Sequence, residues 1–240
     1  MKPKEILVFG ASGQIGRHLI RKLTKNNYKV VAVTRNIHQK GYILKTQANP
    51  GYLEIVELTY FNLEKIQNLL NECSICINLI GILFEKRNNY FKNIHTHFPD
   101  LLSKLSAKKN IQKLIHLSSL GIEKSFESNY AASKLNGETK IKNNFSRAIL
   151  LKPSVVYSVD DNFTTNFMTL INRLPFIPLY YEGKTKFAPI HVTDLAQIIF
   201  DVVEGKVNEK TIECIGPEIL SFKEIILKLL KSLDKKRLLI

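Results

Sequence analysis

A tyrosine and a lysine, Tyr130 and Lys134, stand four residues apart in a stretch that predicts a helix over 130–142. Residues at this spacing share one helix face. A cation beside a phenol favours the phenolate, so the pair can exchange a proton with a carbonyl or carbinol. Ser118 and Ser119 end a strand-like run upstream, where a hydroxyl can hydrogen-bond a substrate oxygen. These four residues are the candidate catalytic groups.

A glycine-rich turn near the start of the chain predicts a different chemistry. Gly10, Gly13 and Gly16 follow the apolar run 6–9 and open a helix-like stretch. In that context the glycines allow a tight turn, close approach of a pyrophosphate to the backbone, and close packing of helix on strand. The N–H groups and dipole at the helix start favour negative charge. The turn is predicted to bind a dinucleotide, and the alternative is a glycine turn without a ligand.

The residues after the second strand bear on which dinucleotide binds. NAD-specific folds place an Asp or Glu there to hold the ribose hydroxyls. Here Arg35 follows the strand, and no acidic residue occurs between Arg17 and Leu53. An Arg can clamp a 2′-phosphate with two hydrogen bonds, whereas a carboxylate repels it. The sequence therefore favours NADP(H), leaving NAD(H) open, and a solvated surface role is the alternative for Arg35.

Alternating apolar and helix-like segments must position these residues. Short strands separated by helices indicate a parallel sheet covered on both faces, a doubly wound α/β fold with a small C-terminal cap. One domain, 1–240, is expected, with a cofactor-binding core, 1–153, and a cap, 154–240. Strands are predicted over 6–9, 30–33, 53–57, 75–80, 113–117, 148–151 and 211–215, and helices over 15–25, 63–70, 91–107, 130–142, 162–172, 194–203 and 222–233.

Composition limits the other classes of protein. The net charge of +14 suits an anionic partner, but the basic residues are scattered without a nucleic-acid motif, so no nucleic acid is expected. Three irregularly placed cysteines form neither a disulfide framework nor a zinc site. His95 and His97 lie two apart on a predicted helix and cannot share a face, so they are read as surface or cleft-lining groups and no metal is expected.

The two ends of the chain carry weaker signals. The first residues lead straight into a strand without room for a signal peptide, and no apolar run is long enough to span a bilayer. A soluble protein of a reducing, cytoplasmic compartment is therefore expected. The chain stops in a basic-then-apolar run, 235–240, as though a further segment were missing. Alternatively, that run contacts a membrane surface, so peripheral membrane association is a second possibility.

Several motifs together resemble a known superfamily. The glycine turn, the Ser-Ser strand end, Tyr-x-x-x-Lys and Lys152-Pro153-Ser154 resemble the extended and atypical short-chain dehydrogenase/reductases. Over essentially the whole chain, further runs are similar to the NAD(P)H-binding accessory subunit of respiratory complex I (NADH:ubiquinone oxidoreductase) and its bacterial relatives. These runs are 78–85, 116–121, 130–138, 175–179 and 184–194.

The resemblance implies a Rossmann-type domain that holds NADP(H) tightly, often as a structural cofactor. By matching positions it implies these contacts: Gly10, Ser12, Gly13, Gln14, Ile15 and Gly16 at the pyrophosphate, Arg35 at the 2′-phosphate, Leu58 near the adenine, Ile80 and Gly81 near the ribose, Tyr130 and Lys134, beside Ser118, at the nicotinamide ribose, and Pro153 and Val156 flanking the nicotinamide. Two positions depart from the superfamily: Lys152 stands where an Arg is common, and Ser158 where a Gly is. Members of the family also usually continue past the position of Ile240.

Three functions follow as hypotheses. The leading one is an NADP(H)-binding accessory or assembly subunit associated with complex I, on the matrix-equivalent side of the inner membrane or in the cytoplasm. The first alternative is an NADPH-dependent reductase, or a sugar-nucleotide epimerase or dehydratase relative, that uses Tyr130 and Lys134. The second alternative is a dinucleotide-sensing regulator.

Overall fold

Seven parallel strands form the central sheet of the computed structural model, which describes residues 5–86, 90–109, 111–125 and 127–240. Their spatial order is β11-β6-β5-β4-β1-β2-β3, and every neighbouring pair is parallel. The order reverses between β1 and β4, and ligands of such sheets bind outside the carboxyl ends of the strands at this point. The strands are β1 (Glu5–Phe9), β2 (Lys29–Thr34), β3 (Leu53–Glu57), β4 (Ile75–Asn78), β5 (Lys113–Leu117), β6 (Ile149–Pro153) and β11 (Thr211–Cys214).

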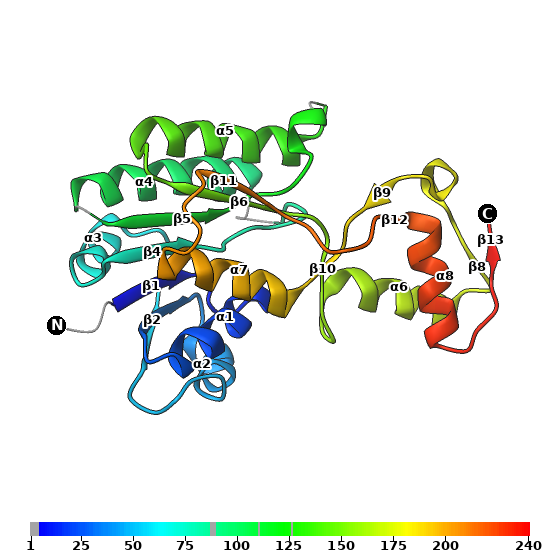
Figure 1. The fold of residues 1–240 in the computed structure, drawn as a ribbon, viewed down its shortest axis with the longest axis horizontal. Coiled ribbons are helices and arrows are strands. Elements are labelled where there is room, and N and C mark those ends of the chain that lie inside the picture. Colours follow the sequence, from blue (N-terminus) through cyan, green and yellow to red (C-terminus); the bar gives the residue numbers. More distant parts are fainter. Residues whose placement is uncertain (1–4, 87–89, 110, 126) are drawn as a thin grey trace.

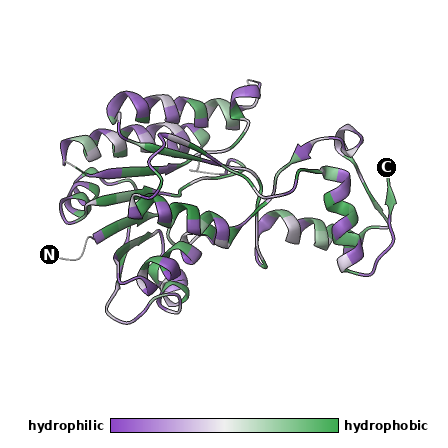
Figure 2. Ribbon diagram, in the orientation of Figure 1, coloured by the Kyte–Doolittle hydropathy of each residue, from purple (hydrophilic) through white to green (hydrophobic). Residues whose placement is uncertain are grey.

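Helices cover both faces of this sheet (Figure 1). Strand side chains alternate between faces, so Ile6 and Val8 of β1 enter one core while Leu7 and Phe9 enter the other. Figure 2 accordingly shows largely hydrophobic strands beside helices with mixed faces. The predicted doubly wound fold is confirmed. One layer contains α1 (Gln14–Lys25), α2 (Ile37–Lys45) and α7 (Val192–Glu204), and the other contains α3 (Leu63–Asn71), α4 (Phe98–Lys108) and α5 (Asn129–Asn144).

The helix that carries Tyr130 packs closely on its neighbour. Helix α5 begins at an N-cap, Ser128, whose side chain accepts a hydrogen bond from the N–H of Ala131. Its Gly137 lies against the backbone of His95, where a Cβ atom would overlap the His95 carbonyl oxygen. His95 belongs to η1 (Lys92–His97), a π-helical turn that runs directly into α4. The predicted helix over 91–107 is therefore a π turn followed by an α-helix, and π turns are frequent at functional sites.

A separate group of elements extends from one end of the sheet (right in Figure 1). We call residues 159–187 and 217–240 the small lobe and the remainder the large lobe. The small lobe has its own apolar cluster, which includes Ile171, Ile177 and Phe222. Its elements are α6 (Asn162–Arg173), η3 (Tyr180–Gly183), α8 (Phe222–Ser232), β8 (Phe176–Ile177), β9 (Lys186–Phe187), β12 (Leu220–Ser221) and β13 (Leu238–Leu239).

Several connections tie the two lobes together. Where the chain leaves the large lobe and returns to it, β7 (Val156–Tyr157) pairs with β10 (Ile190–His191). Helix α7 and strand β11, which follow residue 153 in the sequence, return to the large lobe: α7 packs on α1, and β11 pairs with β6. The terminal apolar run is held in the small lobe, where β13 pairs with β8. A short 3-10 turn, η2 (Ile122–Lys124), completes the described elements.

Candidate functional site

The predicted site residues lie where the strands end. Gly10 follows β1, Arg35 follows β2, Leu58 follows β3 and Ile80 lies two residues past β4. They surround one cavity of about 410 Å³ at the point where the strand order reverses. Of the residues predicted to contact a dinucleotide, the structure brings these to that cavity: Gly10, Ser12, Gly13, Arg35, Leu58, Ile80 and Gly81.

The glycine turn has the geometry of an anion-binding loop. Gly10 adopts φ 76°, and a Cβ atom there would lie 2.9 Å from the carbonyl carbon of Leu79. Only glycine tolerates that combination without strain. The N-cap of α1 is Gly13, and no described side chain caps this helix start. The first-turn N–H groups, those of Gln14, Ile15 and Gly16 among them, therefore lack a side-chain cap, and the turn fits a pyrophosphate.

Positive charge gathers on the part of this cavity that follows β2. Arg35 and Lys40 line it, and none of the described lining residues is acidic. Glu57, at the end of β3, does not line the cavity. Its carboxylate accepts hydrogen bonds from the N–H of Ile37 (2.9 Å) and the hydroxyl of Thr59 (3.4 Å). This electrostatic setting suits an anionic substituent on the ligand.

The candidate catalytic pair lies deeper, at the end of β5. The Tyr130 hydroxyl and the Ser119 hydroxyl are 2.8 Å apart. Lys134 is buried, and its ammonium donates to the carbonyl of Leu117 (3.3 Å) while lying 5.8 Å from the centre of the Tyr130 ring. These contacts hold three of the four predicted catalytic groups together.

The protonation of this pair differs from the sequence expectation that Lys134 favours a phenolate. Burial raises the pKa of Tyr130, and the hydrogen bond with Ser119 only partly opposes that rise. Burial also lowers the pKa of Lys134 to about 8, with Glu138 acting in the opposite direction. The lysine is thus a weaker source of positive charge than an exposed one, because burial disfavours its charged form. Near neutral pH, Tyr130 is a phenol that can donate a proton.

The fourth predicted catalytic residue, Ser118, occupies a different environment. It is buried beside Glu138; burial raises the pKa of that carboxyl, and the Ser118 hydroxyl opposes the rise. Glu138 also lies 3.2 Å from the ammonium of Lys152, which pairs in addition with Glu123. The lysine that replaces the superfamily's arginine therefore fastens β6 to α5. Of the two serines, the structure directs Ser119 toward Tyr130 and Ser118 away from it.

Sequence reasoning missed the part played by His95. It was read as a surface or cleft-lining group, but its side chain is buried because the π turn directs it inward, whereas His97 is exposed. Its Nε2 accepts from the N–H of Ile82 (3.1 Å), so Nδ1 carries the proton and donates to Ser133 (3.0 Å). Ser133 in turn donates to the carbonyl of Tyr130 (2.7 Å). Burial lowers the pKa of His95 to about 3, which keeps the imidazole neutral.

Gly81 joins the two halves of the site. It lines the cavity, and a Cβ atom at this residue would lie 3.8 Å from the Lys134 ammonium and 3.9 Å from Nε2 of His95. Pro153 and Val156, predicted to flank a nicotinamide, are placed at the end of β6 and in β7. The carbonyl of Pro153 accepts from the N–H of Leu120, the residue after Ser119. The open cavity and the Tyr130 end are therefore neighbouring parts of one region at the carboxyl ends of the strands.

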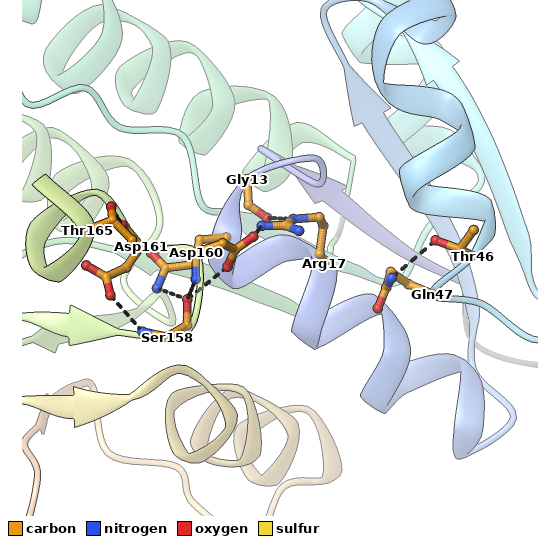
Figure 3. Close-up of polar contacts among 9 residues, drawn as sticks. Gly13, Arg17, Thr46, Gln47, Ser158, Asp160, Asp161 and Thr165 are labelled. Atoms are coloured by element: carbon orange, nitrogen blue, oxygen red, sulfur yellow. Dashed lines mark hydrogen bonds and ion pairs between the residues drawn. The ribbon is translucent and has the colours of Figure 1, made fainter. Parts of the chain in front are cut away.

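The small lobe reaches the glycine turn through a polar contact (Figure 3). Arg17, at the end of the first turn of α1, forms an ion pair of 2.5 Å with Asp160. Gln14 donates to the hydroxyl of Ser158 (2.9 Å), which donates to Asp160 (3.0 Å). Asp161 is the N-cap of the next helix, α6, and its side chain accepts a hydrogen bond from the N–H of Thr164. The serine that replaces the superfamily's glycine thus participates in the link between the lobes.

Comparison with known proteins assigns this architecture. The family model described as "NAD dependent epimerase/dehydratase family" matches residues 6–214. The UDP-glucuronic acid 4-epimerase of Bacillus cereus, solved with UDP-glucuronic acid and NAD, superposes with a TM-score of 0.81 at 21% identity. That alignment covers 98% of this chain and 85% of the epimerase chain. At this identity the superposition supports the fold alone.

Two relatives are mitochondrial proteins named NADH dehydrogenase (ubiquinone) 1 alpha subcomplex subunit 9. The one from Dictyostelium discoideum is 29% identical over 220 residues, which are 91% of this chain and 61% of the relative. The one from Arabidopsis thaliana is 28% identical over 222 residues, which are 91% of this chain and 55% of the relative. The chain thus spans little more than half the length of these relatives, and the resemblance to this subunit is confirmed.

Proposed function

We propose, because this chain belongs to the NAD dependent epimerase/dehydratase family, that it binds a nicotinamide dinucleotide along the carboxyl edge of its sheet and prefers NADP(H). The observation that carries the preference is the cavity at the glycine turn. It combines a helix start without a side-chain cap with Arg35 and Lys40, and no described lining residue is acidic. A 2′-phosphate would gain charge-assisted hydrogen bonds there, whereas the ribose hydroxyls of NAD(H) would meet no carboxylate.

Each part of the dinucleotide is assigned to residues at this edge. The glycine turn would take the pyrophosphate, Arg35 the 2′-phosphate, Leu58 the adenine, and Ile80 with Gly81 the ribose. Tyr130 and Lys134 would hold the nicotinamide ribose, and Pro153 and Val156 would flank the nicotinamide. Ser118, which is buried beside Glu138 and directed away from Tyr130, receives no contact in this assignment. The bound nicotinamide would supply hydride chemistry. The chain's own residues would bind it, orient it and exclude water from the Tyr130 end.

The proposed role is that of an accessory or assembly subunit with a tightly held cofactor, associated with respiratory complex I. Two relatives carry the name of an NADH dehydrogenase subunit. The Tyr130 end also favours tight holding, because its polar groups are buried or half-buried and already hydrogen-bonded to protein partners. Among the described helices, none has both the length and the apolar character needed to cross a membrane. We place the protein on the matrix-equivalent face of the inner membrane, as a peripheral component, or in the cytoplasm.

The first experiment measures the cofactor that the purified protein retains. The protein is denatured, and the supernatant is analysed by mass spectrometry; the apoprotein is then titrated with NADPH and NADH. One NADPH per chain that resists exchange is the expected result. Retention of NADH, or equal affinity for both dinucleotides, would contradict the proposed preference, and binding of neither would contradict the proposed function itself.

A second candidate function is an NADPH-dependent reductase or an epimerase-like enzyme. The observation in its favour is the 2.8 Å contact between the Ser119 and Tyr130 hydroxyls, beside a buried Lys134. A protonated Tyr130 would donate its proton to a substrate oxygen, and Ser119 would orient that oxygen. The test is a screen of carbonyl compounds for steady oxidation of NADPH. Turnover that disappears in Tyr130→Phe would establish the enzyme.

A further inference from the structure

A second cavity, of about 330 Å³, lies between the two lobes and shares no lining residue with the cavity at the glycine turn. One wall comes from the large lobe and includes Val155 and Pro189, which directly precede β7 and β10. The other comes from the small lobe and includes Phe163 of α6 with Ile225 and Leu229 of α8. A site built from both lobes in this way is a common location for small-molecule ligands.

The walls of this inter-lobe cavity are mainly apolar. Leu220 and Pro217 complete the apolar lining described above. The Phe163 ring packs on Phe167 at 5.2 Å between centroids, and that ring packs on Phe222 at 5.1 Å. The wall is therefore anchored to the small-lobe core. An apolar surface held open in this way gains free energy when a hydrocarbon displaces water from it.

The charges on the lining neutralise each other. Among the described lining residues only Glu218 and Lys228 are charged, and their side chains form an ion pair of 2.8 Å. Each side chain is about three-fifths exposed, at 61% and 60%. A diphosphate placed here would lack a free cation on the lining and would face the Glu218 carboxylate. The cavity at the glycine turn, with Arg35 and Lys40, shows the opposite pattern.

We infer that the inter-lobe cavity binds an uncharged apolar chain, such as the hydrocarbon part of an acyl or isoprenoid molecule, rather than the phosphate-bearing half of a sugar nucleotide. At about 30 Å³ for each water-sized group, the volume accommodates a chain of about ten carbon atoms. The cavity begins at Val155, two residues past Pro153, whose carbonyl is bonded to the segment that carries Ser119. A polar group at the end of the hydrocarbon chain would then point toward Tyr130. That orientation rests on the second candidate function, whereas binding of the hydrocarbon chain itself does not.

The experiment measures binding of decanol and of UDP-glucose to the whole chain by calorimetry, with and without NADPH. The variants are Leu229→Gln, which places an amide on the cavity wall, and Leu227→Gln, a control on the same helix at a side chain that is 46% exposed and does not line the cavity. Decanol is expected to bind saturably, one per chain. Its affinity should fall about tenfold in Leu229→Gln and stay unchanged in Leu227→Gln.

A second variant keeps the test decisive if Leu229→Gln unfolds. Lys228→Met changes an exposed lining residue and replaces the cation of the ion pair with an apolar side chain, while the exposed Glu218 carboxylate stays in contact with water. It should strengthen decanol binding about threefold. Three results would overturn the inference. They are saturable binding of UDP-glucose but not of decanol, binding of neither compound, and a decanol affinity that neither Leu229→Gln nor Lys228→Met changes. Dodecanoate and farnesol then distinguish acyl from isoprenoid ligands. Failure of NADPH to bind in the same experiment would count against the proposed function and not against this site.

Discussion

The two ends of the proposed dinucleotide site hold their polar groups in opposite ways. At the glycine turn, backbone N–H groups and the surface cations Arg35 and Lys40 line an open cavity. At the other end, Lys134 and His95 are buried and Tyr130 is half-buried, and all three already have hydrogen-bond partners within the protein. The open end is suited to attracting an anion, and the buried end to fixing the geometry of whatever reaches it.

This difference has an energetic consequence. Exposed cations act through water, so each contributes modestly and is screened by salt. Buried groups cannot exchange partners with water, so their arrangement is formed before a ligand arrives. The contrast predicts that substitutions at the open end change affinity and cofactor preference, while substitutions at the buried end change turnover or stability.

The largest expected effect is at the buried end. Tyr130→Phe removes the hydroxyl that contacts Ser119 and leaves the ring in place. If the protein reduces a carbonyl compound, turnover should fall about 10²- to 10⁴-fold, because a positioned general acid contributes that much. NADPH affinity should fall by about tenfold at most, because the hydroxyl is only one of the contacts proposed for the dinucleotide. Steady-state kinetics and a parallel titration measure the two quantities. Tyr42→Phe, at an exposed tyrosine, is the control. Full turnover in Tyr130→Phe would remove the buried end from the chemistry.

The open end should respond to loss of one cation. Arg35→Ala is expected to weaken NADPH binding by about 10- to 100-fold, since a hydrogen bond to a charged group contributes about 1.5–3 kcal/mol. NADH binding should be nearly unaffected, because NADH carries no 2′-phosphate. Arg21→Ala, an exposed arginine that does not line the cavity, is the matched control in the same titration. An equal loss for both dinucleotides would show that Arg35 does not read the 2′-phosphate.

Acid should lower the stability of the folded protein through the neutral histidines at the buried end. Burial lowers the pKa of His95 and of His116 to about 3, from an ordinary 6.5. Between those values the unfolded chain binds more protons, so stability is lost as pH falls below about 6.5. Each histidine should lower the free energy of unfolding by about 2 kcal/mol at pH 5 relative to pH 7.5.

Urea unfolding at these two pH values measures the loss. His95→Gln should lose about 2 kcal/mol less between them than the control His97→Gln, whose side chain is exposed in the native protein. Each variant is judged by the change in its own free energy of unfolding between pH 7.5 and pH 5, so a lower starting stability of His95→Gln does not affect the comparison. Identical pH dependence in both variants would mean that folding does not lower the pKa of His95.

The sequence predicted the sheet better than the helices, for identifiable reasons. Buried parallel strands are short apolar runs, and the predicted strands of the central sheet lie where expected. The strand beginning at Ile75 ends early, because the Asn78 side chain accepts the N–H of Ile80 (3.1 Å). Helix α2 was not predicted: it contains Gly41 and has no clear apolar face. Its one local signal was Asn36, which caps it by accepting from Gln39 (3.0 Å).

The candidate site divides in the same way. Residues that act through local backbone geometry, such as Gly10 and Gly13, could be identified from spacing alone. The inward direction of His95 could not, because it depends on a π turn and on the close approach that Gly137 allows. The link between Arg17 and Asp160 spans 143 positions and arises only when the small lobe folds against α1. No pattern of neighbouring residues encodes such a contact.

That link gives the smallest and most specific prediction for the open end. Asp160 holds Arg17, whose guanidinium also donates to the carbonyl of Gly13 (3.4 Å), so a carboxylate competes for a cation beside the predicted pyrophosphate position. The Arg17 hydrogen bond also lowers the pKa of Asp160, so the carboxylate is charged at neutral pH.

Asp160→Asn removes that negative charge, and dinucleotide affinity should rise about two- to threefold at low salt because the ion pair is partly exposed. The gain should fall at 0.5 M salt, where charges more than a few ångströms apart are screened. It should be the same for NADPH and NADH, since both carry the pyrophosphate, which distinguishes it from the effect of Arg35→Ala. The control is Glu72→Gln, at the end of α3, which directly precedes β4 and therefore lies at the amino ends of the strands, away from the glycine turn. Weaker binding in Asp160→Asn would mean that the ion pair instead holds Arg17 in its binding position, and that the small lobe helps to build the open end.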